Sequence, residues 1–179
     1  MYYVGKCRFV SVNIIFKGLW TYNVNVPPKN RKESEKKIPI SHLNENEYTH
    51  VHGEIQIIIN GKVLPSFGID SPDDVCFGYW IEMFTKLFEV FNMGLCQYTI
   101  EGGDQGKPAY KFEKEGDCVY FSIVDSMLGG KRDPDWQRIE FSYRDLKKAF
   151  LEFKNRFIDT IRVCAPQMVD YWSKKFGIY

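Results

Sequence analysis

The fold class is decided by residues 142–164, SYRDLKKAFLEFKNRFIDTIRVC, which have the pattern of a long amphipathic helix. Ser142 and Asp145 give the start signal of a capped helix. The apolar residues that follow recur at intervals of three and four, so they share one helix face: Leu146, Ala149, Phe150, Phe153, Phe157, Ile161 and Cys164. Pro166 is predicted to kink the helix, and the apolar face continues to Phe176. Such a face has to be buried against another layer of structure.

That layer is predicted to be an antiparallel sheet, because several strand-like segments precede the helix. They are rich in β-branched and aromatic residues and are separated by Gly-containing turns: Leu95 to Ile100, Ala109 to Glu113, Cys118 to Asp125 and Trp136 to Phe141. Each segment lies close enough to the next in sequence for antiparallel pairing.

Two hairpins are predicted nearer the N-terminus. The first joins Cys7 to Phe16 with Trp20 to Val26 around Lys17-Gly18. In the second, isoleucines alternate with polar residues from Val51 to Ile59, and Asn60-Gly61 is a strong turn signal. Its return strand is expected from Lys62 to Phe67.

A central helix is predicted from Pro72 to about Met93. Ser71-Pro72-Asp73-Asp74 has the composition of a helix start, and Gly94 stands where a helix normally ends. We therefore expect one α+β domain over residues 1–179, an antiparallel sheet with the central and C-terminal helices packed on one face. Residues 27–50 are expected to form one long loop, which is either functional or disordered.

Composition excludes several classes of protein. The chain has 179 residues, 16% of them aromatic, which is enough for a sizeable core. Its 24 basic and 23 acidic side chains leave a net charge of +1, so no overall field favours nucleic acid or an anionic membrane. No segment has the length and apolar character of a membrane span.

The cysteines bear on the compartment. Cys7, Cys76, Cys96, Cys118 and Cys164 are odd in number and widely spaced, and most lie in apolar runs. No pair has the spacing of a zinc knuckle or a redox motif. We therefore expect reduced core cysteines and, since the N-terminus lacks the pattern of a secretory signal, a cytoplasmic protein.

All three histidines, His42, His50 and His52, fall within eleven residues. The strand period of two places His50, His52 and Glu54 on one face, opposite the isoleucines. Two imidazoles and a carboxylate suit Zn²⁺ or another divalent metal, with His42 as a further ligand. The same pattern is also typical of the polar face of a half-buried strand.

Other patterns give no catalytic constellation. Residues 101–106 are Gly-rich but lack the ending of a phosphate loop, so they are predicted to be a hairpin turn. Residues 126–135 are predicted to be a solvated connection, with a protein contact as the minority interpretation. The serines lack a neighbouring histidine, and the basic residues of the C-terminal helix interleave with acids, as on a solvated face.

The layout carries a resemblance. The hairpin ending near Asn60-Gly61, the Gly68-Ile69-Asp70-Ser71-Pro72 entry to a Trp80-bearing helix, two further strands and a Phe-rich closing helix follow in that order. The two strands are Tyr110-Lys111-Phe112-Glu113 and Val119-Tyr120-Phe121-Ser122-Ile123. This order resembles the small single-domain immunity proteins that bacteria pair with polymorphic or contact-dependent toxins. The resemblance implies a non-enzymatic cytoplasmic protein that binds a toxin domain and blocks it.

Three hypotheses follow. The first is a protein-binding module of the immunity type that needs no cofactor. Its contacts are expected from Lys29–Lys37, Glu101–Gly106 and Lys131–Asp135, with Lys131, Arg132, Asp133, Asp135 and Asp104 as the partner-binding residues. The second is a metal-dependent enzyme or metal-binding domain on the histidine face. The third is a small-ligand carrier, which requires a cavity among the aromatic residues.

Overall fold

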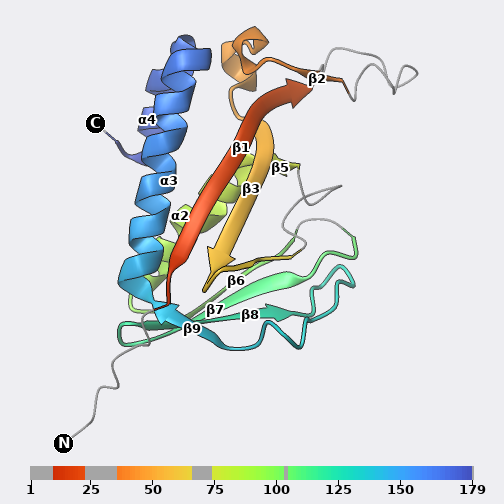
Figure 1. The fold of residues 1–179 in the computed structure, drawn as a ribbon, viewed down its shortest axis with the longest axis vertical. Coiled ribbons are helices and arrows are strands. Elements are labelled where there is room, and N and C mark those ends of the chain that lie inside the picture. Colours follow the sequence, from red (N-terminus) through yellow and green to blue (C-terminus); the bar gives the residue numbers. More distant parts are fainter. Residues whose placement is uncertain (1–9, 23–35, 66–73, 103–104, 179) are drawn as a thin grey trace, which may run out of the picture.

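The computed structural model describes residues 10–22, 36–65, 74–102 and 105–178. Within these residues, two antiparallel sheets and three α-helices enclose one apolar core (Figure 1). This confirms the predicted α+β class with an antiparallel sheet and a C-terminal helix. The strands divide between two sheets instead of sharing one.

The first sheet is built on two long strands, β1 (Val12–Tyr22) and β3 (His52–Ile59), which pair antiparallel. Three two-residue strands complete it: β2 (Lys37–Ile38), β4 (Lys62–Val63) and β5 (Val75–Cys76). The order is β2-β1-β3-β4, and β5 also pairs with β3. Burial alternates along β3 with Ile55, Ile57 and Ile59 facing inward, as its sequence pattern predicted.

The predicted hairpin around Lys17-Gly18 is wrong, because β1 runs through this position as one strand. The β1–β3 register shifts between Lys17, opposite Glu54, and Trp20, opposite His52, so β1 carries one extra residue. Gly18 has φ +63°, the left-handed backbone that is typical of a glycine bulge. The glycine therefore bends the strand and does not reverse it.

The second sheet is a four-stranded meander in the order β6-β7-β8-β9. Its strands are β6 (Gln97–Ile100), β7 (Ala109–Glu115), β8 (Cys118–Val124) and β9 (Ile139–Ser142). All three pairings are antiparallel, which confirms the pairing of sequence neighbours.

The described part of the chain forms the helices α2 (Phe77–Asn92), α3 (Tyr143–Cys164) and α4 (Val169–Phe176). Helix α3 begins as predicted, since the Ser142 hydroxyl accepts a hydrogen bond from the Asp145 amide at 3.3 Å. Pro166 opens a 3-10 turn, η4 (Pro166–Met168), that separates α3 from α4. The predicted start of α2 at Pro72 is wrong: Val75 and Cys76 form β5, and the helix begins at Phe77.

The expected long loop is only partly a loop. Its described end contains β2 and the 3-10 turns η2 (Ile40–His42) and η3 (Glu45–Glu47). Ile40, Leu43 and Tyr48 are buried, so this segment belongs to the core. Residues 27–35 of the expected loop lie outside the described residues, as do residues 66 and 67 of the expected return strand.

Aromatic rings join the layers. Helix α3 lies alongside β1 (Figure 1), and the Phe16 ring of β1 packs edge-on against Phe153 and Phe157 of α3. Phe77 of α2 stacks on Phe157 with ring centroids 5.1 Å apart. Trp80 contacts Tyr110 of the second sheet, so both sheets share this core. None of the described helices is long and apolar enough to cross a membrane.

Candidate functional site

Two connecting loops meet at one end of the strands of the second sheet. Residues 101–108 link β6 to β7 and residues 125–138 link β8 to β9, so a meander places both at the same end. The Gly106 amide donates to the Leu128 carbonyl at 3.0 Å, and the Met127 amide donates to the Glu101 carboxylate at 3.3 Å. We call the described residues of 101–108 and 125–138 the loop surface.

The two loops approach each other closely at Gly130. A Cβ atom at this position would lie 1.9 Å from the Lys107 carbonyl oxygen and 2.4 Å from the Pro108 nitrogen. Both are backbone atoms, so the contact requires a residue without a side chain. The packing of the two loops thus explains why position 130 is a glycine.

Hydrogen bonds within residues 125–138 fix the shape of that loop. The Arg132 amide donates to Asp125 at 3.0 Å, and the Asp135 amide donates to Asp133 at 2.9 Å. Trp136 is buried and packs edge-on against Phe121 with ring centroids 6.0 Å apart. The expected solvated connection is therefore an ordered loop anchored in the core.

The outer side of the loop surface combines apolar and charged groups. Met127 is 85% exposed and Leu128 is 47% exposed. Lys131, Arg132 and Asp135 are exposed and Asp133 is half-buried, so four predicted partner-binding residues share one loop. Asp104 lies outside the described residues. Sequence reasoning missed Met127 and Leu128, whose signal was two adjacent apolar residues in a Gly-containing turn.

The third expected contact segment, Lys29–Lys37, is described only at Lys36 and Lys37. The Lys37 ammonium lies 3.6 Å from the ring centroid of Trp20, in a cation–π contact. The remaining positions, 29–35, lie outside the described residues.

On the strand face that carries His52, the Asp74 carboxylate forms contacts that the sequence did not predict. His52 Nδ1 lies 3.1 Å from an oxygen of Asp74, and the Tyr22 hydroxyl donates to the other oxygen of that carboxylate. Trp20 Nε1 donates in turn to the Tyr22 hydroxyl at 3.3 Å. Strands β1 and β3 thus bring Tyr22 and His52 to Asp74, which directly precedes β5.

The other predicted metal ligands lie apart from this contact. Glu54 forms an ion pair with Lys17 at 3.2 Å and accepts a hydrogen bond from Gln56. His50 is exposed before β3, and His42 is exposed in η2. No group of three His, Cys, Asp or Glu side chains suited to a metal ion occurs within the part of the chain that the structure describes. An imidazole that is oriented by a carboxylate is typical of metal ligands. The His52–Asp74 contact is therefore the reason why metal binding stays the alternative hypothesis.

Burial lowers the pKa of His52 below its ordinary value of 6.5, and this effect outweighs the Asp74 carboxylate, which raises it. Between the folded-state pKa and 6.5, the unfolded chain binds more protons at this residue than the folded one. The contribution of His52 to stability is therefore present above pH 6.5 and is lost as the pH falls below it.

We expect His52→Gln to lower the dependence of the unfolding midpoint on pH between pH 7.5 and 5.5. The measurement is thermal unfolding followed by circular dichroism across that range. His42→Gln is the control, because His42 is exposed on η2 and outside this contact. Equal pH dependence in His52→Gln and the wild type would contradict the assignment of this pH-dependent stability to His52.

The cysteines differ from the expected set of reduced core residues. Cys96 and Cys164 are exposed free thiols, and Cys76 is a half-buried one. Cys164, which ends α3, therefore does not belong to the buried stripe. Cys118 is buried and disulfide-bonded, so the expectation of reduced cysteines is wrong for this residue.

No family model, no curated protein and no solved structure matches this chain.

Proposed function

We propose that this protein is a non-enzymatic protein-binding module whose partner docks on the loop surface. The carrying observation is that Met127 and Leu128 project from a loop that is held by its own hydrogen bonds and by the neighbouring loop. An ordered loop loses less conformational entropy on binding than a mobile one. Exposed apolar side chains beside charged groups are typical of interaction surfaces.

The charges define the partner's chemistry. Lys131 and Arg132 are exposed cations, whereas the carboxylates of Asp125 and Asp133 accept backbone hydrogen bonds within the loop. Asp125 and Asp135 are exposed as well, so the partner would supply an apolar pocket for Met127 and Leu128 with charged groups of both signs at its rim.

The most concrete form of this proposal is an immunity-type inhibitor that blocks a toxin domain in the cytoplasm. Its support is the order of elements along the chain, together with a loop surface that can cover an active site. A lasting Cys118 disulfide in protein taken from cells would place the protein in an oxidising compartment instead.

We expect Met127→Asp combined with Arg132→Glu to weaken partner binding at least about tenfold, since central interface side chains commonly contribute 1–2 kcal/mol each. Both side chains are exposed, so the unfolding midpoint should not change. The measurement is affinity capture from a lysate of the source organism, followed by titration of the captured protein.

The matched control is Val163→Asp, which introduces the same charge at another apolar side chain that is 85% exposed. A protein retained by the wild type and by Val163→Asp, but lost by the loop variant, would support the proposal. Equal retention by all three baits would exclude the loop surface as the docking site. Inhibition of a captured toxin by the wild type alone would establish the immunity form.

A further inference from the structure

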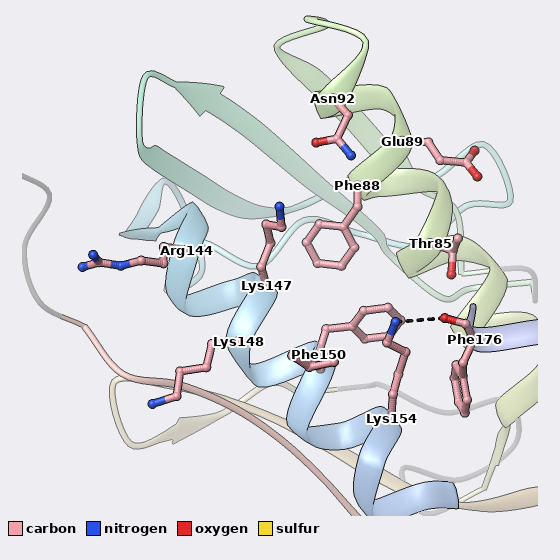
Figure 2. Close-up of a pocket in the computed structure, with 11 residues that line it drawn as sticks. Thr85, Phe88, Glu89, Asn92, Arg144, Lys147, Lys148, Phe150, Lys154 and Phe176 are labelled. Carbon is pink, nitrogen blue, oxygen red and sulfur yellow. Dashed lines mark hydrogen bonds between the residues drawn. The ribbon is translucent and has the colours of Figure 1, made fainter. Parts of the chain in front are cut away.

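A groove of about 590 Å³ lies between α2 and α3, outside the loop surface (Figure 2). Phe88 of α2 and Phe150 of α3 pack against each other along it, with ring centroids 5.2 Å apart. Phe176, at the end of α4, adds a third ring, and the half-exposed Leu151 lies on the rim. The volume falls within the range of small-molecule sites, and the floor is apolar.

The walls of the groove are strongly basic. Arg144, Lys147, Lys148 and Lys154 are among its lining residues, against the single carboxylate of Glu89. Lys147 and Lys154 lie beside the phenyl rings, whereas the charged ends of Arg144 and Lys148 point away from them (Figure 2). Lys148 has a distant ion pair with Glu152, at 3.8 Å. In the described parts of the chain, Arg144, Lys147 and Lys154 form no ion pair. The groove is therefore an apolar surface under a positive field that the protein's own acids leave uncompensated.

Lys154 is the most constrained of these cations. Its ammonium donates to the Phe176 carbonyl at 3.1 Å and lies 5.4 Å from the Phe150 ring centroid (Figure 2). The side chain is half-buried, and this burial lowers the pKa of its ammonium. Partial burial of this charge is unfavourable, and the Phe176 carbonyl together with the Phe150 and Phe176 rings offsets part of that cost. An anion bound next to the ammonium would offset more of it.

We propose that this groove binds an amphipathic carboxylate, with its apolar chain on Phe88 and Phe150 and its carboxylate against Lys154. Two uncharged polar residues also line the groove, and both are engaged within the protein: the Thr85 hydroxyl donates to the Ile81 carbonyl at 2.8 Å, and the Asn92 carbonyl oxygen accepts from the Tyr143 hydroxyl at 3.3 Å. The three phenyl rings supply no hydrogen bonds, which favours an acyl chain over a nucleotide base, because a base brings polar edges that need partners. The cations of the groove favour a ligand whose head group is anionic. This site is independent of the loop surface and does not require the proposed partner.

The test compares decanoate with decanol, two probes that share an apolar chain and differ in charge. Binding to the full chain is measured by calorimetry at pH 7.5, below the micelle concentration of decanoate. We expect decanoate to bind at least about tenfold more tightly than decanol, as a charge-assisted contact would provide. Lys154→Met, which keeps an apolar side chain, should abolish this preference.

Lys62→Met is the matched control, since Lys62 is an exposed lysine on β4. Leu151→Glu gives a second variant at an exposed position, where the added negative charge should weaken decanoate binding and spare decanol. The proposal is overturned if neither probe binds, if decanol binds as tightly as decanoate, or if folded Lys154→Met keeps the preference.

Discussion

Replacing Phe157 with alanine is expected to lower the free energy of unfolding by about 3–5 kcal/mol. Phe157 is completely buried on α3. Its ring packs against rings from β1, α2, α3 and α4: Phe16, Phe77, Phe153, Trp172 and Phe176. Because four elements share the resulting cavity, no single element can move to fill it.

The measurement is urea unfolding followed by tryptophan fluorescence. Phe157→Leu keeps much of the buried volume and should cost clearly less than Phe157→Ala. Val163→Ala on the same helix is the exposed control and should change stability by less than about 0.5 kcal/mol. A loss below about 1 kcal/mol in Phe157→Ala would show that the core tolerates the cavity, contrary to this packing.

The elements that could be predicted from sequence are those in which local pattern and tertiary packing agree. The stripe from Leu146 to Ile161 is buried as expected, because helical spacing fixes which residues share a face. The meander from β6 to β9 followed from strand-like segments that are neighbours in sequence and separated by Gly-containing turns, which favour antiparallel pairing. In both cases, nearby residues decide the structure.

The predictions are wrong where contacts between residues distant in sequence decide the structure. A left-handed glycine serves a hairpin turn or a bulge equally well, and only the pairing of β1 with β3 shows that Gly18 is a bulge. Asp74 was assigned to a helix start, whereas its carboxylate meets His52 from β3. Sequence spacing carries no information on such contacts.

Contacts between residues distant in sequence also explain why the arrangement of the groove and of the loop surface was not predicted. Lys147 and Lys154 were assigned to a solvated face because acids alternate with them along the sequence, yet their neighbours in space include the phenyl rings of α2 and α4. The contact between residues 101–108 and 125–138 depends on the meander bringing both loops to one edge. The candidate residues were partly predictable, but their arrangement was not.

The loop surface depends on one backbone contact, which Gly130→Ala is expected to break. A Cβ atom there would lie within 2.4 Å of backbone atoms of Lys107 and Pro108, and backbone cannot move aside as a flexible side chain can. The two loops must separate, which we expect to cost about 1–3 kcal/mol. The hydrogen bond from the Gly106 amide to Leu128 should then be lost.

Gly129→Ala is the neighbouring control. Gly129 has φ +86° but no atom within 4 Å of an added Cβ, so this variant carries backbone strain without a clash. Both variants should lower stability, the control by about 1–2 kcal/mol. Only Gly130→Ala should accelerate hydrogen exchange at the Gly106 amide, and it should reduce partner capture by at least about tenfold. If Gly130→Ala and Gly129→Ala behave alike in exchange and capture, the contact between the loops does not shape the binding surface.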